Sequence, residues 1–196
     1  MNVAILVGGK GGRIGKDKGM LMLCGKTFTE ILLEKFQDCN IVLVCRDEYQ
    51  AEEYSKFGET VVDEIKNFSP LAGIYSALKY FKDYTLIVAV DMPLVKRELA
   101  EFLFKTCIEE KADAVVPTWS DGKVEPLLAC YSYDSMEKIW SCIKMGERRV
   151  YKSIERMSAI YYPIDKLRMF DKDLLSFMNV NTEEDYKKIL KVVGCL

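Results

Sequence analysis

The sequence contains no histidine among its 196 residues, and this absence narrows the chemistry available to the protein. Imidazole is the usual base of catalytic triads and a frequent ligand of zinc, so both kinds of site lack their usual residue. Any bound metal is therefore expected to be a hard cation held by oxygen atoms. The seven cysteines include no C-x-x-C pair, and an odd number is atypical of a disulfide framework, so we expect reduced thiols.

Long apolar runs and an excess of basic charge are also missing. The apolar stretch Val3–Val7 is too short for a secretory signal, and no later stretch is long enough to span a membrane, so we expect a cytoplasmic protein. A formal net charge of −2 provides no general basic field, which argues against nucleic acid as a partner. With 49% hydrophobic and 30% charged residues, the chain can bury one substantial core, and we expect a single domain over residues 1–196.

Short β-rich apolar runs alternate with segments of helical periodicity. This pattern predicts β-α-β units and a mostly parallel, Rossmann-like sheet covered by helices on both faces, in a three-layer α/β/α sandwich. The expected strands in this region are 3–7, 41–44, 60–62, 86–90 and 114–116, and the expected helices are 28–36, 71–81 and 99–108.

The pattern changes after Pro117, where Asp121-Gly122 predicts a turn. Thr182 is expected to cap a final helix whose first turn is acidic and which ends at about Val192. The other elements expected here are strands at 127–133 and 177–180 and helices at 135–144 and 150–156.

A glycine-rich, basic stretch, AILVGGKGGRIGKDKGML, follows the first expected strand at residues 4–21. It fails the Walker pattern because Gly15-Lys16 is followed by Asp17, and it fails G-x-G-x-x-G because the third glycine falls on Ile14. Glycine backbone N–H groups can still face a polyphosphate while nearby cations offset its charge. A glycine-rich turn with solvated lysines is the alternative. The remaining pattern, G-G-x(3)-R-x-G-x-D-K, contains Gly8, Gly9, Arg13, Gly15, Asp17 and Lys18.

The stretch LVGGKGGRIGKDKGMLMLCGK resembles the glycine signature of the nucleotidyltransferase superfamily, and specifically that of the molybdenum cofactor guanylyltransferases, the MobA family. Val7 departs from the usual alanine of this signature, and the loop has Lys-Gly-Gly where a small polar residue is common. Four later segments are similar to the same family in the same order: VVDEIKNFSPLAGIYSAL at 61–78, IVAVDMPLV at 87–95, VEPLLACY at 124–131 and FMNVNTEEDY at 177–186.

The resemblance implies a sheet of the nucleotidyltransferase type and a reaction in which GMP passes from GTP to the terminal phosphate of molybdopterin, with release of pyrophosphate. GTP and molybdopterin would then be the substrates and Mg²⁺ the cofactor. Residues 1–110 would form mainly the GTP-binding half and 111–196 mainly the acceptor-binding half. Transient contact with molybdenum-insertion or apo-molybdoenzyme proteins is a further expectation.

The resemblance also assigns residues to roles. Arg13, Lys18 and Asp91 are the expected catalytic residues, with Asp91 as the metal ligand. Asp91 follows the apolar run 86–90, and ligands collect at the carboxyl ends of parallel strands, although an aspartate there can also cap a helix or form a turn. The expected nucleotide-binding residues are Leu6, Val7, Gly8, Gly9, Gly15, Lys18, Asp63, Pro70, Leu71, Gly73 and Asp91.

Asp63 could accept hydrogen bonds from the guanine N1–H and 2-amino groups or from a ribose hydroxyl, and a solvated loop aspartate is the alternative. On the acceptor side the expected residues are Glu125, Asn179, Asn181 and Arg148. Asn181 could instead form a capping turn before Thr182, and Arg148 could lie in a solvated basic turn.

Three other functions stay open at this point. Two are related nucleotidyltransferases, the molybdopterin cytidylyltransferase and the adenosylcobinamide-phosphate guanylyltransferase, and the third is a non-catalytic nucleotide-binding module. The choice of GTP over CTP depends on the resemblance alone. The presence of both Lys18 and Asp91 argues against a mere binder, which has little need of a metal carboxylate.

Overall fold

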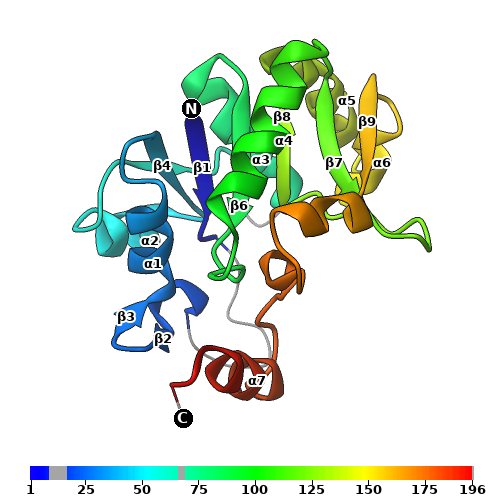
Figure 1. Ribbon diagram of the computed structural model, residues 1–196. Helices are drawn as coiled ribbons and strands as arrows, with labels where there is room; N and C mark the ends of the chain where they lie inside the picture. Colours follow the sequence, from blue (N-terminus) through cyan, green and yellow to red (C-terminus); the bar gives the residue numbers. More distant parts are fainter. Residues whose placement is uncertain (9–16, 66–68, 196) are drawn as a thin grey trace.

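The computed structural model describes residues 1–8, 17–65 and 69–195 (Figure 1). Within these residues, seven strands form one sheet in the order β5-β4-β1-β6-β8-β7-β9. All neighbouring strands pair in parallel except β8, which is antiparallel to both β6 and β7, so the prediction of a mostly parallel sheet is confirmed. The strands are β1 Asn2–Leu6, β4 Asn40–Cys45, β5 Thr60–Val62, β6 Thr85–Ala89, β7 Ala114–Thr118, β8 Leu128–Tyr131 and β9 Ala159–Pro163.

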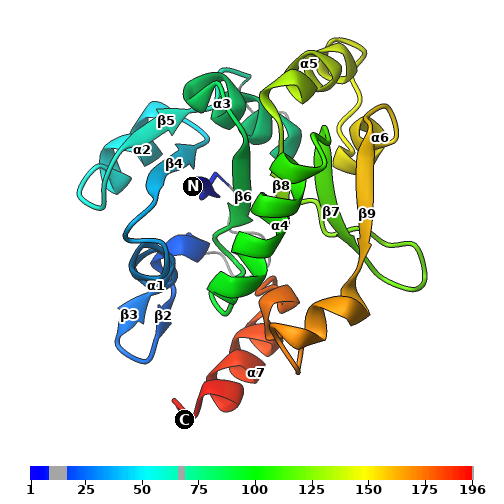
Figure 2. The ribbon, with the colours of Figure 1, turned by 45° about the horizontal axis from the view of Figure 1, so that its top comes forward.

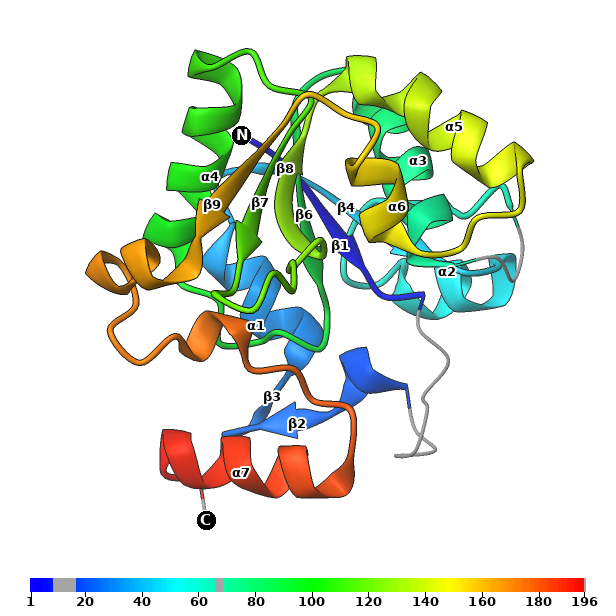
Figure 3. The same cartoon turned by 90° about the vertical axis from the view of Figure 1, so that its right-hand side faces the viewer.

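Helices cover both faces of this sheet because its central strands are apolar on both sides. In β1, Val3 and Ile5 belong to one hydrophobic cluster and Ala4 to the other. Figure 3 shows α4 on one side of the sheet and α3, α5 and α6 on the other, which confirms the predicted three-layer arrangement. The helices of the described residues are α1 Phe28–Lys35, α2 Glu48–Tyr54, α3 Pro70–Phe81, α4 Arg97–Glu109, α5 Met136–Lys144, α6 Val150–Ile154 and α7 Glu183–Val193.

Capping residues explain where the helices next to the expected site begin. Ser69 caps α3 by accepting from the Leu71 N–H, and Pro70 at the first helical position has no N–H to leave unpaired. Thr182 caps α7, as the sequence predicts, and the structure adds a reciprocal pair in which the Asp185 side chain accepts from the Thr182 N–H. Both caps fix the chain immediately beside residues that the sequence analysis assigns to the site.

Several elements differ from the expectations, among them helix α2 and two short strands at 22–23 and 26–27, which the sequence analysis does not predict. The strand predicted at 177–180 is wrong, because a short 3₁₀ turn at Leu175–Phe177 ends at Phe177, residues 178–180 form no strand, and Val180 is buried. The Val180 N–H donates to the carbonyl of Asp91 at 3.0 Å, so its partner lies in the turn after β6 rather than in a strand. The edge strand β9 is only half-buried, and the sequence analysis does not predict it.

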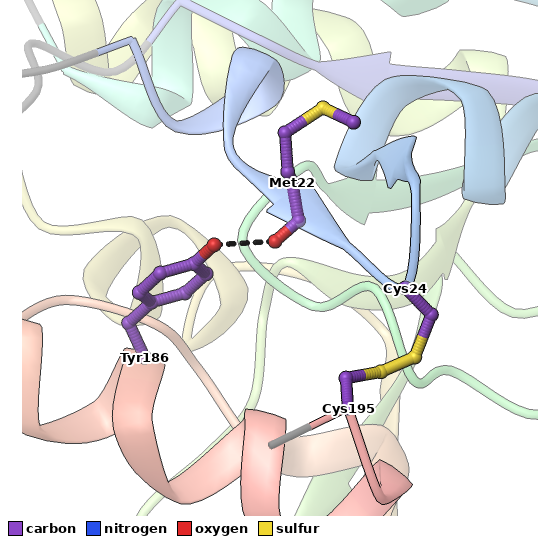
Figure 4. The surroundings of a disulfide bond; sticks show 4 residues. All are labelled: Met22, Cys24, Tyr186 and Cys195. Carbon is purple, nitrogen blue, oxygen red and sulfur yellow. Dashed lines mark hydrogen bonds between the residues drawn. A yellow bond between two sulfur atoms is a disulfide. The ribbon is translucent and has the colours of Figure 1, made fainter.

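A small hairpin, β2 Met22–Leu23 and β3 Lys26–Thr27, lies beside α7 on the same side of the molecule (Figures 1 and 2). Cys24 and Cys195 form a disulfide between the two, and the Tyr186 hydroxyl donates to the Met22 carbonyl (Figure 4).

The disulfide corrects the expectation that every thiol is reduced. The sequence positions of Cys24 and Cys195 are 171 residues apart, but their Cα atoms lie 5.4 Å apart, which is within the range that a disulfide bridges. The other five cysteines of the described chain are free, and four of them are buried. No helix within the residues described is both long and apolar enough to cross a lipid bilayer.

Candidate active site

A pocket of about 500 Å³ lies where the carboxyl ends of β1, β4, β5 and β6 meet. This is the edge at which ligands collect in open α/β sheets. The residues that line it come from segments far apart in the sequence: Leu6, Val7, Gly8, Lys18, Val44, Arg46, Asp63, Ser69, Pro70, Gly73, Ala89, Val90, Asp91, Leu127 and Asn181.

The end of β1 is held from both sides by neighbouring strands. The Val7 N–H donates to the Val44 carbonyl at 3.0 Å, and the Val90 N–H donates to the Leu6 carbonyl at 3.1 Å. A Cβ atom on Gly8 would lie 3.2 Å from the backbone nitrogen of Arg46, so a side chain here would make a tight contact with the start of the loop that follows β4. Gly8 therefore lets the backbone pass close to Arg46 where it lines the pocket.

Lys18 is presented by a short 3₁₀ turn that Asp17 anchors. The Asp17 carboxylate accepts from the Gly19 N–H at 3.0 Å, from Gln50 Nε2 at 2.8 Å and from the Tyr54 hydroxyl at 2.5 Å. Burial of Tyr54, followed by its bond to Asp17, raises the pKa of this phenol well above its ordinary value, so it stays a donor. Asp17 thus fastens the turn to α2, and the sequence analysis gives no such structural role to this aspartate.

Lys18, Asp91 and Asn181 converge at one point of the pocket. The Lys18 ammonium donates to Asp91 Oδ2 at 2.7 Å and to Asn181 Oδ1 at 2.6 Å. The Lys18 and Asp91 side chains are only 12% and 18% exposed, so solvent screens their attraction weakly. The structure brings together a cation and a carboxylate that the sequence analysis assigns to catalysis.

Asp63 lies at the opposite side of the pocket, directly after β5. Its carboxylate accepts from the Ser76 hydroxyl at 2.9 Å. Burial raises the pKa of Asp63 to about 6, although the Ser76 bond opposes this shift. Pro70 and Gly73 of α3 line the same part of the pocket. A Cβ atom on Gly73 would lie 3.4 Å from the Leu6 side chain, which is ordinary van der Waals contact, so α3 packs against the end of β1 here without strictly requiring a glycine.

Four predicted residues lie outside the pocket lining. Leu71 belongs to α3, and its side chain is fully buried in the hydrophobic core. Glu125 is 5% exposed, and its carboxylate accepts from Trp119 Nε1 at 2.6 Å and pairs with the Lys123 ammonium at 3.1 Å. Asn179 is half-buried and Arg148 is exposed. The structure therefore gives Leu71 and Glu125 local structural partners, whereas Asn181 lines the pocket.

Three predicted residues, Gly9, Arg13 and Gly15, lie outside the described residues. The sequence analysis does not find Arg46, which lines the pocket at the end of β4. Its guanidinium pairs with Asp47 at 3.1 Å and lies 3.9 Å from Asp17. The sequence does contain an indication of this role. Arg46 is the first charged residue after the buried strand β4, as Asp91 is after β6, and each comes two residues after the strand residue that pairs with Leu6.

A second pocket of about 490 Å³ adjoins the first, and Leu127 lines both. Tyr151 and Tyr161 contribute rings that are 39% and 46% exposed. The complete lining is Gly122, Lys123, Val124, Pro126, Leu127, Val150, Tyr151, Glu155 and Tyr161. Aromatic faces beside a carboxylate and an ammonium suit a flat, polar heterocycle.

Within the described chain, no group of three acidic, cysteine or histidine side chains is arranged to hold a metal ion. The oxygen atoms that face the pocket near Lys18 come from Asp91 and Asn181. One carboxylate with an amide oxygen fits Mg²⁺, which commonly takes only one or two protein oxygens and completes its shell with water and substrate phosphates.

Comparison with known proteins agrees with this geometry. Residues 3–159 match the family model of the MobA-like NTP transferase domain. Probable molybdenum cofactor guanylyltransferases of Thermococcus kodakarensis and Methanothermobacter thermautotrophicus are each 35% identical, covering 95% of this chain and 92% and 97% of theirs. The crystal structure of molybdopterin-guanine dinucleotide biosynthesis protein A from Archaeoglobus fulgidus is 41% identical over the full length of both chains, with a TM-score of 0.93. The chain therefore belongs to the family of MobA-like nucleotidyltransferases.

Proposed function

We propose that this protein transfers GMP from GTP to molybdopterin, producing the guanine dinucleotide form of the cofactor and pyrophosphate. The main structural support for this proposal is that Lys18 and Asp91 form an ion pair in one pocket, beside the end of β1. The names of the full-length relatives supply the substrates. The family membership places the chemistry among nucleotidyl transfers.

The proposed reaction joins two anions, so neutralising charge matters more than a strong base. An oxygen of the acceptor phosphate attacks the α-phosphorus of GTP, and the bond from that phosphorus to the bridging oxygen of pyrophosphate breaks. Lys18 stabilises the charge that develops, and Arg13 keeps its predicted role beside it. Bound Mg²⁺ would withdraw electron density from the phosphate oxygens, with Asp91 as its protein ligand.

Asp63 is the proposed partner of the guanine base. Its carboxylate lies at the end of β5 beside α3, in the same pocket as Lys18. Two parallel acceptors match the guanine N1–H and 2-amino donors, whereas a cytosine edge offers a different pattern. Leu6, Val7 and Gly8 supply backbone along the nucleotide, and Gly9 and Gly15 keep their predicted roles there.

The acceptor is proposed to extend from Asp91 past Leu127 into the second pocket. Tyr151 and Tyr161 would then face the pterin ring. The contribution of Glu125, Asn179, Asn181 and Arg148 to acceptor binding stays a prediction, as does the division into halves at about residue 110. A cytoplasmic location and contact with molybdenum-insertion or apo-molybdoenzyme proteins are part of the same proposal.

The test is pyrophosphate release measured with GTP, Mg²⁺ and molybdopterin. We expect release that depends on the acceptor and falls at least about 100-fold in Asp91→Asn, because the variant loses the charge that holds the metal. Glu34→Gln is the matched control, since Glu34 is an exposed carboxylate that also pairs with a lysine. Release with CTP, or with a cobinamide phosphate acceptor, would replace this proposal by one of the related transferases. Binding of GTP without any release would indicate a non-catalytic module.

A further inference from the structure

The Lys18 ammonium occupies the position between two oxygen atoms that come from distant parts of the chain. It donates to Asp91 Oδ2, after β6, and to Asn181 Oδ1, before α7. A carboxylate oxygen and an amide oxygen that both face one cation are the donor types that hard divalent cations use. The lysine therefore fills what has the composition of a cation site.

Contacts that do not involve Lys18 hold the backbone of Asp91 and Asn181 in place. The Val180 N–H donates to the Asp91 carbonyl at 3.0 Å, which joins the segment before α7 to the turn after β6. The Asn181 N–H donates to Asp185 Oδ2 at 3.1 Å, within the network that caps α7 at Thr182. Removal of the lysine side chain should therefore leave the backbone that carries both oxygens in the same arrangement.

We propose that Asp91 Oδ2 and Asn181 Oδ1 form the protein part of a divalent-cation site, and that the Lys18 ammonium occupies this site until a metal-nucleotide complex displaces it. In this proposal Asn181 acts toward the metal. Lys18 acts twice, first as the resident cation and then as a phosphate ligand. This proposal rests on the proposed function at one point only, namely that the ligand which displaces Lys18 is a nucleoside triphosphate.

Charge balance explains why the metal and the nucleotide should arrive together. A single carboxylate cannot neutralise both an ammonium and a divalent cation, so a bare metal meets repulsion from Lys18 at close range. A triphosphate brings enough negative oxygens to ligate the metal and to receive the displaced ammonium. The lysine stem has four carbons and freely rotatable bonds, which suits a charge that moves between two partners. Lys18 thus makes metal binding depend on the nucleotide.

The first test titrates Mn²⁺ into the protein without nucleotide and follows the electron paramagnetic resonance signal of the free ion. Lys18→Met should bind Mn²⁺ about tenfold or more tightly than the unsubstituted protein, because the competing ammonium is gone. Lys26→Met is the matched control, since Lys26 pairs with a carboxylate at 2.6 Å on the exposed surface. Equal Mn²⁺ affinity of Lys18→Met and the unsubstituted protein overturns the proposal.

The second test addresses Asn181. Adding Asn181→Ala to Lys18→Met should abolish most of the gain in Mn²⁺ affinity, and Asn181→Asp with Lys18 retained should strengthen Mn²⁺ binding by adding a second carboxylate. If Lys18→Met does not fold, as judged by thermal melting, Asn181→Asp decides alone. Unchanged Mn²⁺ affinity in the Asn181 variants overturns the two-oxygen site. None of these titrations contains GTP or molybdopterin, so their outcome does not depend on GMP transfer. If the protein does not transfer GMP, the proposed function is overturned, but the conclusion about the cation site is unaffected.

Discussion

At the scale of single residues, two aspartates have opposite environments: Asp63 lines the pocket, whereas Asp17 lies outside its lining, next to Lys18 in the sequence. The Asp17 carboxylate accepts three hydrogen bonds from other parts of the protein and anchors the 3₁₀ turn to α2, so its role is structural. Asp63 is half-buried and its carboxylate accepts from the Ser76 hydroxyl, but burial outweighs this bond and raises the pKa of Asp63 to about 6. A carboxylate with unused acceptor capacity beside a pocket is suited to bind donors from a ligand.

The raised pKa of Asp63 predicts a pH dependence of GTP binding. Below pH 6 the free protein carries Asp63 mostly protonated, and the proton must leave before the group can accept two hydrogen bonds. The affinity for GTP should therefore fall as the pH is lowered from 7 to 5, approaching a tenfold loss per pH unit below 6. Calorimetric titration over this range measures the effect.

Asp63→Asn supplies the control for titration of the GTP phosphates themselves. This variant should bind GTP weakly and without the pH dependence that is due to Asp63. A dependence of the same size in both proteins would show that Asp63 does not titrate with binding.

At the scale of elements, the 3₁₀ turn that carries Lys18 depends on a close contact with α2. A Cβ atom on Gly19 would lie 2.2 Å from the Tyr54 hydroxyl and 2.7 Å from Thr29 Oγ1. Neither atom is free to move, because the Tyr54 hydroxyl bonds to Asp17 and Thr29 Oγ1 donates to the Gly19 carbonyl. The position of Lys18 therefore depends on the absence of a side chain at the next residue.

Gly19→Ala should displace this turn and destabilise the protein by roughly 1–3 kcal/mol, as overpacking of a filled site does. The KM for GTP should rise because Lys18 leaves its position. Urea unfolding and steady-state kinetics measure the two effects. Combining Gly19→Ala with Tyr54→Phe removes the closest atom and should recover part of the lost stability. A double variant that is less stable than both single variants would contradict this explanation.

The disulfide between Cys24 and Cys195 joins the hairpin to α7 and closes a loop of 171 residues. Cross-links of this length restrict the unfolded chain strongly, and removal should lower the free energy of unfolding by roughly 2–5 kcal/mol. Urea unfolding with and without reductant measures this difference. The double variant Cys24→Ser/Cys195→Ser should match the reduced protein and show no response to reductant. Cys39→Ser should retain the response.

At the scale of the whole molecule, the two adjoining pockets have different lining side chains apart from Leu127. A substitution in one pocket is therefore expected to affect the binding of one substrate and not of the other. The Tyr151 ring lies 5.6 Å from the Arg149 guanidinium and 5.1 Å from the Lys152 ammonium, so it is flanked by cations next to the second pocket. Tyr151→Ala should raise the KM for molybdopterin roughly 5–10-fold and leave the KM for GTP unchanged. Tyr49→Ala is the control, because Tyr49 is an exposed tyrosine outside both pockets. A change in the KM for GTP alone would place the acceptor elsewhere.

The sequence predicts those parts of this architecture that local pattern determines. Central strands such as β1 and β6 are continuous apolar runs, and each delivers its following residues to the ligand edge. The half-exposed β9, AIYYP, has tyrosine and proline where the central strands have aliphatic residues, so its pattern does not stand out as a buried strand. The disulfide and the contact between Asp17 and α2 depend on which distant segments meet, and a linear pattern carries no information about that. The resemblance to a family predicts Asn181 in the site, but only the structure shows its contact with Lys18.

The pairing of Lys18 with Asn181 spans 163 positions of the chain. During synthesis on the ribosome, β1 and Lys18 are made well before Asn181 and the helix that positions it. Until Asn181 has been added, the nascent protein carries Lys18 without this partner and lacks one wall of its pocket. With the cation site proposed above, capture of a metal-nucleotide complex requires that α7 has left the exit tunnel and docked against the hairpin.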